Sequence, residues 1–260
     1  MTNILVVGGT RGFGLALVQY FASKPETTVY ATARGSHPSV EASSSTSRIK
    51  WISGIDLMKA SCGTDIASQV KDTAFSIVFI SAGVFELETF DDPGPKWDVE
   101  VATYTTSAIA PPFIVSELYK AKNLPKGAKI VLISSEAGSF ALQQAGGGGN
   151  YAHHASKSAV NMVGLQLKYD LEPKGIIIAM VHPSFMRTEM TKGVGFDVAY
   201  DENDALTPDQ AAKLVGDWTE KDLDMSKTGQ FWAPRGTRDI GTWRETMGRD
   251  HIKGPVQLPW

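Results

Sequence analysis

Short apolar runs and longer segments with helical periodicity alternate along this chain. Runs rich in β-branched residues predict strands at residues 4–7, 28–34, 49–53, 75–80, 129–133, 176–181 and 228–232. Amphipathic segments between them predict helices at residues 15–23, 61–72, 97–121, 153–171 and 208–221. Helices that connect successive strands are typical of parallel sheets. The pattern therefore predicts an α/β fold, with a doubly wound, mainly parallel sheet of about seven strands and helices on both faces.

Local signals refine some of these boundaries. Thr207 has a suitable side chain for the N-cap of the last predicted helix. Pro111 and Pro112 lack a backbone N–H, so we expect them to bend or interrupt the helix at 97–121. The polar, serine-rich segment 35–47 is predicted to be an exposed loop.

The composition is that of an ordinary soluble protein, because 42% of the 260 residues are hydrophobic and 20% are charged. No composition shift marks a linker, so residues 1–260 are predicted to form a single domain. The net charge of −3 gives no electrostatic reason to expect nucleic acid or a membrane as a partner. Cys62 is the only cysteine, which excludes an intramolecular disulfide and fits a reducing compartment. No signal-peptide pattern precedes the first strand, so a cytoplasmic location is expected.

A glycine-rich loop follows the first predicted strand, with the sequence Gly-Gly-Thr-Arg-Gly-Phe-Gly at residues 8–14. Glycine is needed there because the chain turns sharply, the backbone approaches a pyrophosphate and the helix packs close to the strand. The free N–H groups at the helix start then bind anionic oxygens. This loop is typical of a Rossmann-type dinucleotide site, and its predicted cofactor contacts are Gly8, Thr10, Arg11, Gly12, Phe13 and Gly14.

The end of the second strand indicates which dinucleotide binds. An acidic residue there would hydrogen-bond a free ribose 2′-hydroxyl, whereas an arginine accommodates a 2′-phosphate. This chain has Arg34 and no acidic residue at 28–35, and Arg11 lies in the glycine loop. A planar guanidinium forms bidentate bonds to phosphate, so NADP is predicted rather than NAD.

The glycine spacing, Gly-x-x-x-Gly-x-Gly, resembles that of the short-chain dehydrogenase/reductase family, with Val7 where members carry threonine. The resemblance extends from Ile4 to about Phe231, and the segment 232–260 is similar to the tails of fungal members related to sniffer- and C-factor-like reductases. It implies a Rossmann fold, NADP(H), a small-molecule substrate and a homodimer or homotetramer. No metal site is implied.

The same resemblance implies further cofactor contacts after strands three, four and six. Asp56-Leu57 is similar to the family's adenine-contacting pair, and the segment after strand four has serine where the family has asparagine. The segment after strand six is similar to the family's Pro-Gly-x-x-x-Thr. These expected contacts are Asp56, Leu57, Ser81, Ala82, Gly83, Pro183, Phe185 and Thr188.

The resemblance also implies a catalytic set of Ser135, His153 and Lys157, the last of which also contacts the cofactor ribose. Histidine stands where the family has its tyrosine, four residues before the lysine and on the same helix face. A neutral imidazole still donates one hydrogen bond and accepts another. The family's catalytic asparagine position is occupied by Ala108. Tyr151, six residues before the lysine, is predicted to lie just outside the helix start.

A substrate loop is expected at 190–206, and the tail at 232–260 is expected to close the pocket or form a dimer contact. Aromatic and large apolar side chains suggest an apolar or aromatic substrate. The predicted substrate contacts are Phe85, Phe140, Tyr151, Phe185 and Met190, with Val194 and Phe196 as further candidate walls.

Three functions remain open at this stage. The first is an NADP(H)-dependent oxidoreductase that reduces a carbonyl or imine, with a role in secondary metabolism as one expectation. The second is a non-redox cyclase, isomerase or dehydratase that uses His153 and Ser135 for proton chemistry. The third is a cofactor-binding regulator without catalysis. The altered tyrosine and asparagine positions favour the second and third over an ordinary reductase.

Overall fold

The computed structural model describes residues 2–35, 37, 46–143 and 148–260. Much of the predicted exposed loop at 35–47 therefore lies outside the described residues. Within the described part of the chain no helix is long and apolar enough to cross a membrane.

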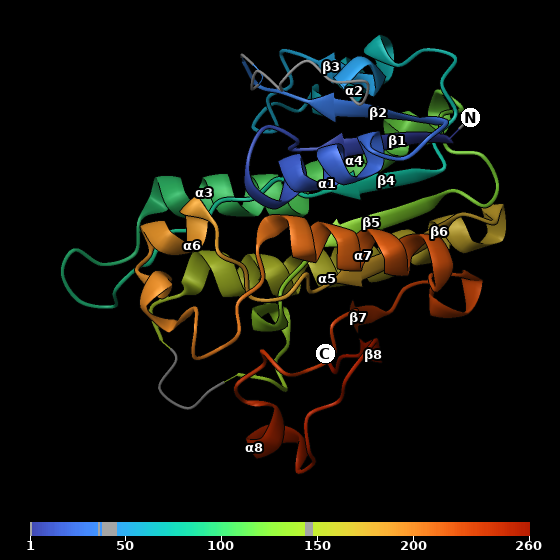
Figure 1. Ribbon diagram of the computed structural model, residues 1–260. Coiled ribbons are helices and arrows are strands. Elements are labelled where there is room, and N and C mark those ends of the chain that lie inside the picture. The colour runs from blue at the N-terminus through green and yellow to red at the C-terminus, as the bar shows by residue number, and fades with distance from the viewer. Residues whose placement is uncertain (1, 36, 38–45, 144–147) are drawn as a thin grey trace.

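The predicted doubly wound sheet is confirmed, in the order β3-β2-β1-β4-β5-β6-β7-β8 (Figure 1). All neighbouring strands are parallel except β7 and β8, which are antiparallel. The short strand β8 was not predicted and adds to the expected seven. The strands are β1 (Thr2–Val7), β2 (Thr27–Thr32), β3 (Ile49–Ile52), β4 (Ile77–Ile80), β5 (Lys129–Ile133), β6 (Ile177–Val181), β7 (Phe231–Ala233) and β8 (Val256–Gln257).

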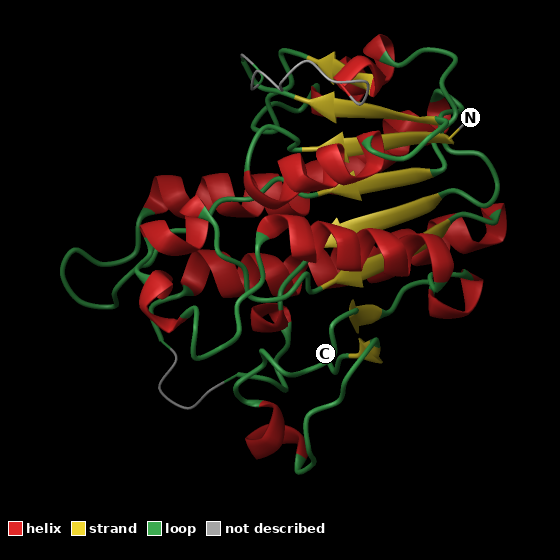
Figure 2. Ribbon diagram, in the orientation of Figure 1, coloured by secondary structure: helices red, strands yellow, loops and turns green. Residues whose placement is uncertain are grey.

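Helices cover both faces of the sheet, as the alternation of strands and helices predicts (Figure 2). Successive side chains of a strand point to opposite faces, so Ile4 and Val6 pack with α1 and α7, whereas Leu5 and Val7 pack with α2, α4 and α5. The helices are α1 (Gly12–Ala22), α2 (Cys62–Gln69), α3 (Trp97–Tyr104), α4 (Ala110–Lys120), α5 (Tyr151–Leu171), α6 (Glu189–Gly193), α7 (Pro208–Lys221) and α8 (Trp243–Met247).

The predicted helix at 97–121 is interrupted, as its prolines indicate. Regular α-helix ends with α3 and resumes with α4, and a π turn spans Thr105–Ile109 between them. Pro111 and Pro112 cannot donate the hydrogen bonds that would continue a regular helix through this turn. The N-cap prediction for α7 is confirmed, because the Thr207 hydroxyl accepts a hydrogen bond from the N–H of Gln210.

The segment after β7 folds back over the carboxyl-terminal half of the sheet. Residues 234–242 lead to α8, and β8 then pairs with β7. Trp243 is fully buried in the core, and its indole N–H donates to the carbonyl of Asp250. In Figure 1 this red segment lies below β6, at the edge of the sheet that β7 and β8 form.

Candidate active site

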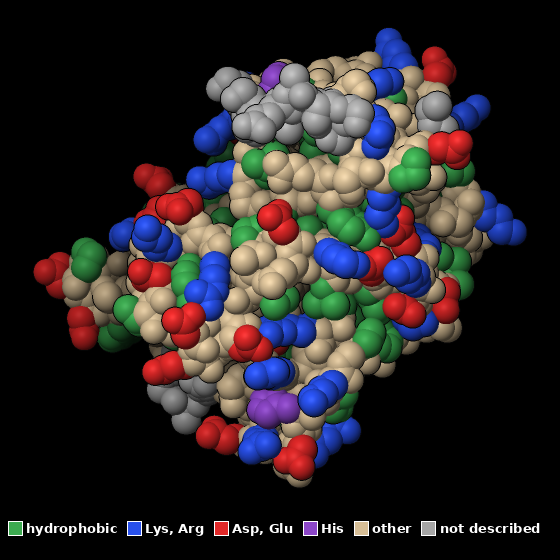
Figure 3. Space-filling model, viewed as in Figure 1, with side chains coloured by type: hydrophobic (Ala, Val, Ile, Leu, Met, Phe, Trp, Pro, Cys, Tyr) green, Lys and Arg blue, Asp and Glu red, His purple; other side chains and the backbone are tan. Residues whose placement is uncertain are grey.

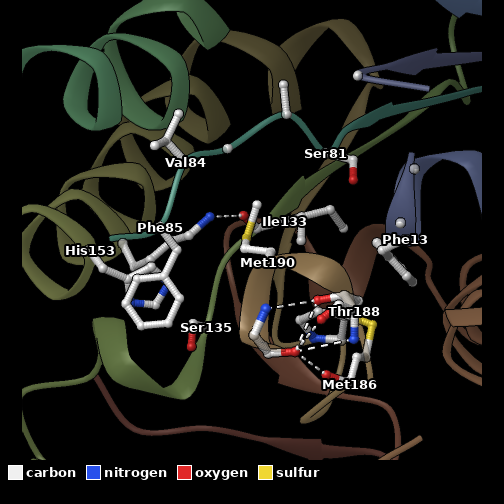
Figure 4. Close-up of a pocket in the computed structure, with 18 of the residues that line it drawn as sticks. Phe13, Ser81, Val84, Phe85, Ile133, Ser135, His153, Met186, Thr188 and Met190 are labelled. Carbon is white, nitrogen blue, oxygen red and sulfur yellow. Dashed lines mark hydrogen bonds between the residues drawn. The ribbon is translucent and has the colours of Figure 1, made fainter. Parts of the chain in front are cut away.

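A cavity of about 1230 Å³ lies at the carboxyl ends of the central strands, where the strand order reverses between β1 and β4. Every residue predicted to contact the cofactor lines it, and so do Ser135, His153 and Lys157. Figure 4 shows Phe85 and His153 together on one side of the cavity, with Phe13 and Ser81 on the other.

The glycine loop forms a cradle that larger residues could not form. Gly8 has a φ of +88° and donates its N–H to the Thr32 hydroxyl at 2.9 Å. A Cβ at Gly14 would lie 2.0 Å from the carbonyl oxygen of Gly8, whereas nothing lies within 4 Å of a Cβ at Gly12. The start of α1 is therefore open to the cavity, and the residues fit a dinucleotide pyrophosphate.

Both predicted arginines lie at this end of the cavity. Arg11 and Arg34 are exposed and line it on the side of the glycine cradle. Among the described residues neither forms an ion pair, unlike Arg187, which binds Asp201. Two guanidinium groups, one just after β2 and one at the start of α1, with no ion pair among the described residues, suit a phosphate ligand.

Lys157 is buried and projects from α5 toward β5. Its Nζ donates to the carbonyl oxygen of Ile133 at 2.8 Å, and burial lowers its pKa to about 8. Gly138 lets this part of α5 approach closely, because a Cβ there would lie 2.6 Å from the carbonyl carbon of Lys157. The backbone contact fixes the lysine near the middle of the cavity.

His153 lies one turn before Lys157 on the same helix, and its ring packs on Phe85 with centroids 4.2 Å apart (Figure 4). Burial and the nearby Lys157 charge lower its pKa to about 3. Its Nδ1 has no hydrogen-bond partner among the described residues. The imidazole is therefore neutral at ordinary pH, and a ligand in the cavity would have to bond its other ring nitrogen, Nε2, because Nδ1 is buried. His154 also lines the cavity and is half-buried.

Ser135 follows β5 and caps the short 3₁₀ helix η3 (Glu136–Gly138). Its Oγ accepts a hydrogen bond from the N–H of Ala137 at 3.2 Å and donates to Glu136 Oε2 at 2.9 Å. The Glu136 side chain is one-third exposed and lines the same cavity. The hydroxyl therefore shares its proton with an adjacent carboxylate.

Behind Glu136 lies a buried histidine held between two carboxylates. His182 Nδ1 is 2.7 Å from Glu136 Oε2, and Nε2 is 3.2 Å from Asp239 Oδ2. Burial opposes the charged imidazole, but the two carboxylates outweigh burial and raise the pKa of His182 to about 10. The same Oδ2 accepts the backbone N–H of Phe185 at 2.6 Å. In the described part of the chain no group of three or more His, Cys, Asp or Glu residues is arranged to hold a metal ion.

The structure brings some of the predicted substrate contacts to the cavity and leaves others outside it. Phe85, Phe185, Met190 and Phe196 line the cavity, and the Phe85 and Phe196 ring centroids lie 5.7 Å apart. Three other predicted residues, Phe140, Tyr151 and Val194, do not line the cavity.

Two of these differences have clear local causes. Phe140 lies after η3 and is 80% exposed, because the chain turns outward there. Tyr151 is the first residue of α5 rather than a loop residue, and it is exposed. The helix starts this early because Glu88 Oε2 accepts the N–H of Ala152 at 2.9 Å.

The asparagine position differs as well. Ala108 is buried in the π turn and does not line the cavity, whereas Thr106 does. The Thr106 hydroxyl donates to the carbonyl of Ala102 at 2.8 Å, so it remains tied to its own helix.

Sequence reasoning missed three groups of the site: Glu136, His182 and Asp239. Glu136 and His182 lie in segments that were predicted to contribute other residues to the site. The acidic residue directly after Ser135 could have indicated Glu136. Asp239 carried no signal, because it reaches His182 only through the folded tail. The cavity wall formed by Ile240, Gly241 and Thr242 was anticipated only as a tail that closes the pocket.

Comparison with known proteins agrees with this geometry. The model of the short chain dehydrogenase family matches residues 2–198. An uncharacterized oxidoreductase of Saccharomyces cerevisiae is 27% identical over 90% of this chain and 96% of its own length. The carbonyl reductase Sniffer of D. melanogaster has a TM-score of 0.71 at 23% identity, over 100% of both chains. An NADPH-bound carbonyl reductase from chicken fatty liver has a TM-score of 0.70 at 21% identity, over 90% of this chain and 96% of its own. This chain belongs to the short-chain dehydrogenase family.

Proposed function

We propose that this protein is an NADPH-dependent reductase of a carbonyl or imine group on a small apolar or aromatic molecule. The observation that carries the proposal is one cavity with a glycine cradle and two arginines at one end and Ser135, His153 and Lys157 at the other. In the described part of the chain neither arginine forms an ion pair. The NADPH in the similar chicken carbonyl reductase supports the choice of cofactor. A role in secondary metabolism stays a prediction.

Each group has a definite task in this reaction. The N–H groups at the start of α1 hold the pyrophosphate, while Arg11 and Arg34 hold the 2′-phosphate. Lys157 binds the ribose beside the nicotinamide. The bound cofactor supplies a hydride to the substrate carbon. Ser135 and the neutral His153 hold the substrate oxygen, and the aromatic wall around Phe85 keeps water away.

His153 acts in this proposal as a hydrogen-bond donor rather than as a charged acid. With a pKa of about 3 it carries no extra proton at neutral pH. A neutral imidazole is a very weak acid, so it orients the oxygen without protonating it. The proton must then come from another group of the site.

Deuterium tracing tests the proposal directly. The protein is incubated with NADPH deuterated at C4 and a panel of aromatic ketones, quinones and cyclic imines, and products are followed by mass spectrometry. Both C4 diastereomers are used. Deuterium in an alcohol or amine product is the expected result. A changed product without deuterium would support the isomerase, dehydratase or cyclase alternative, in which the same residues move only protons.

A further inference from the structure

Ser135, Glu136, His182 and Asp239 form one continuous chain of hydrogen bonds that runs from the cavity into the protein. A single oxygen, Glu136 Oε2, lies 2.9 Å from Ser135 Oγ and 2.7 Å from His182 Nδ1. The far ring nitrogen of His182 faces Asp239 at 3.2 Å. One carboxylate oxygen thus joins a hydroxyl at the cavity surface to a buried imidazole.

The hydrogen positions follow from the charges around the ring. Glu136 and Asp239 face His182 from opposite sides, and both ring nitrogens of an imidazolium donate. The backbone N–H of Glu136 also points at Nδ1, with 3.2 Å between the two nitrogens. A protonated Nδ1 cannot accept that bond, and it donates instead to the nearer Glu136 Oε2 at 2.7 Å. Farther out lie two titratable but neutral imidazoles, His153 and His154, on the Glu136 side and the charged Arg235 beside Asp239.

We propose that Glu136 and His182 deliver, through Ser135, the proton that completes reduction of the substrate. Both are positioning residues, because neither touches the substrate oxygen and both act through Ser135. The inference rests on the proposed reductase function and adds a proton source that replaces the family's tyrosine.

The step balances as follows. Hydride addition leaves an anionic oxygen on the substrate, and that oxygen takes the Ser135 hydroxyl proton. Ser135 Oγ takes a proton from Glu136 Oε2, which has received it from His182 Nδ1. One N–H bond of the imidazolium breaks and one O–H bond forms on the product. Ser135 ends as a hydroxyl and Glu136 as a carboxylate.

His182 regains its proton from water through the same carboxylate. The Glu136 side chain is one-third exposed at the cavity, whereas the His182 side chain is 4% exposed. Solvent therefore reaches the imidazole by way of Glu136. Asp239 keeps the ring protonated and oriented, since it bonds Nε2 and is itself held by the Phe185 N–H.

The test compares Glu136→Gln and Asp239→Asn with Glu86→Gln, which removes an exposed carboxylate paired with Lys96 outside the cavity. Reduction of 9,10-phenanthrenequinone by deuterated NADPH is measured across pH. For Glu136→Gln we expect kcat to fall by about 100-fold, the lower range for a lost general acid. For Asp239→Asn we expect a smaller loss. Glu86→Gln should match the wild type.

The pH profile separates proton delivery from a structural role. Wild-type kcat/KM should show one falling limb near pH 8, where Lys157 loses its proton, and a second near pH 10, where His182 does; only the second reports the relay. In Asp239→Asn one of the two carboxylates that raise the His182 pKa is gone, so the second falling limb moves to lower pH. The Kd for NADPH, measured by fluorescence, should stay at its wild-type value in both variants. Added formate should restore activity to Glu136→Ala by supplying the missing carboxylate.

A second readout needs neither substrate nor cofactor. In ¹⁵N-histidine NMR of the free protein, His182 should show both ring nitrogens protonated up to about pH 10. Glu136→Gln and Asp239→Asn should each lower that midpoint. A neutral His182 at pH 7 in the wild type would overturn the proton source. If the wild type transfers deuterium and both variants keep the wild-type pH profile of kcat/KM, the relay is overturned but the reductase function stands. If the wild type transfers no deuterium, both the reductase function and the relay are overturned.

Discussion

At the scale of single residues, the proposed function gives His153 the task of orienting the substrate oxygen and leaves the supply of the proton to other side chains. The ring packs on Phe85 beside the Lys157 charge, which removes its ability to hold an extra proton. Its N–H can still hold an oxygen. Proton supply then falls to the acidic chain behind Ser135, so orientation and acidity reside in different side chains.

Removing His153 tests this division. His153→Ala should lower kcat/KM by about 10- to 100-fold, the value of one hydrogen bond in a desolvated site. The loss should be equal between about pH 5 and pH 9, because a group with a pKa near 3 does not titrate there. His153→Gln keeps an N–H donor and should recover part of the loss. A wild-type ionisation near pH 6 that disappears in His153→Ala would contradict a neutral imidazole.

The arginines at the adenosine end predict a cofactor preference. Arg34→Ala should raise the Kd for NADPH by about 10- to 100-fold, since a charge-assisted hydrogen bond contributes about 1.5–3 kcal/mol. The Kd for NADH should change little. Arg238→Ala is the matched control, because Arg238 is exposed and pairs with Asp204 outside the cavity. Equal losses for both cofactors in Arg34→Ala would contradict 2′-phosphate recognition.

At this scale the sequence could predict site residues that lie directly after a strand. Residues that follow each strand could be assigned to the cavity, because the carboxyl ends of parallel strands meet at one edge. Asp239 could not be assigned, since its contact with His182 depends on how the tail folds over β6. Phe140 was misassigned because an aromatic side chain near a catalytic segment carries no direction in the sequence.

Among the elements, α5 matters most to the site, because His153 and Lys157 lie in its first two turns. Glu88 is buried, accepts the N–H of Ala152 through Oε2 and accepts the N–H of Lys96 through Oε1. One carboxylate thus joins the start of α5 to the start of α3. The sequence could not reveal this, because the capping residue comes from a loop 64 positions away. The predicted start at 153 was late for that reason.

Glu88→Gln should weaken the helix starts, because Glu88 accepts the two N–H groups through two different oxygens and Gln replaces one of them by an NH₂ donor. We expect the free energy of unfolding in urea to drop by about 1–3 kcal/mol, the cost of a buried unpaired donor. Glu86→Gln, at an exposed position two residues away, should cost less than about 0.5 kcal/mol. Equal losses of unfolding free energy in Glu88→Gln and Glu86→Gln would show that the buried carboxylate does not cap the helices.

For the molecule as a whole, a group of exposed apolar side chains on adjoining helices predicts self-association. On the face shown in Figure 3 acidic and basic side chains are interspersed, with no large patch of one sign. Large apolar side chains are exposed instead on the π turn, α4 and α5, namely Ile109, Phe113, Tyr119, Met162 and Tyr169. Exposed apolar groups on adjoining helices are typical of protein interfaces.

Phe113→Asp tests this surface. The wild type is expected to sediment as a homodimer or homotetramer, and a charge among these apolar side chains should raise the dissociation constant at least tenfold. Val198→Asp is the control, since Val198 is highly exposed but lies in the substrate loop. A wild type that sediments as a monomer at micromolar concentration would contradict the predicted assembly.

Because part of the site comes from the carboxyl-terminal tail, its parts are synthesised and can fold at different times. Gly8 leaves the ribosome long before Asp239, by on the order of ten seconds or more at ordinary translation rates. The nascent chain can therefore finish the cradle and pair β1 to β6 while His182 still lacks its second carboxylate. The protein acquires its capacity to hold a nucleotide first and its full proton-delivery chain only after residues 234–242 have been made.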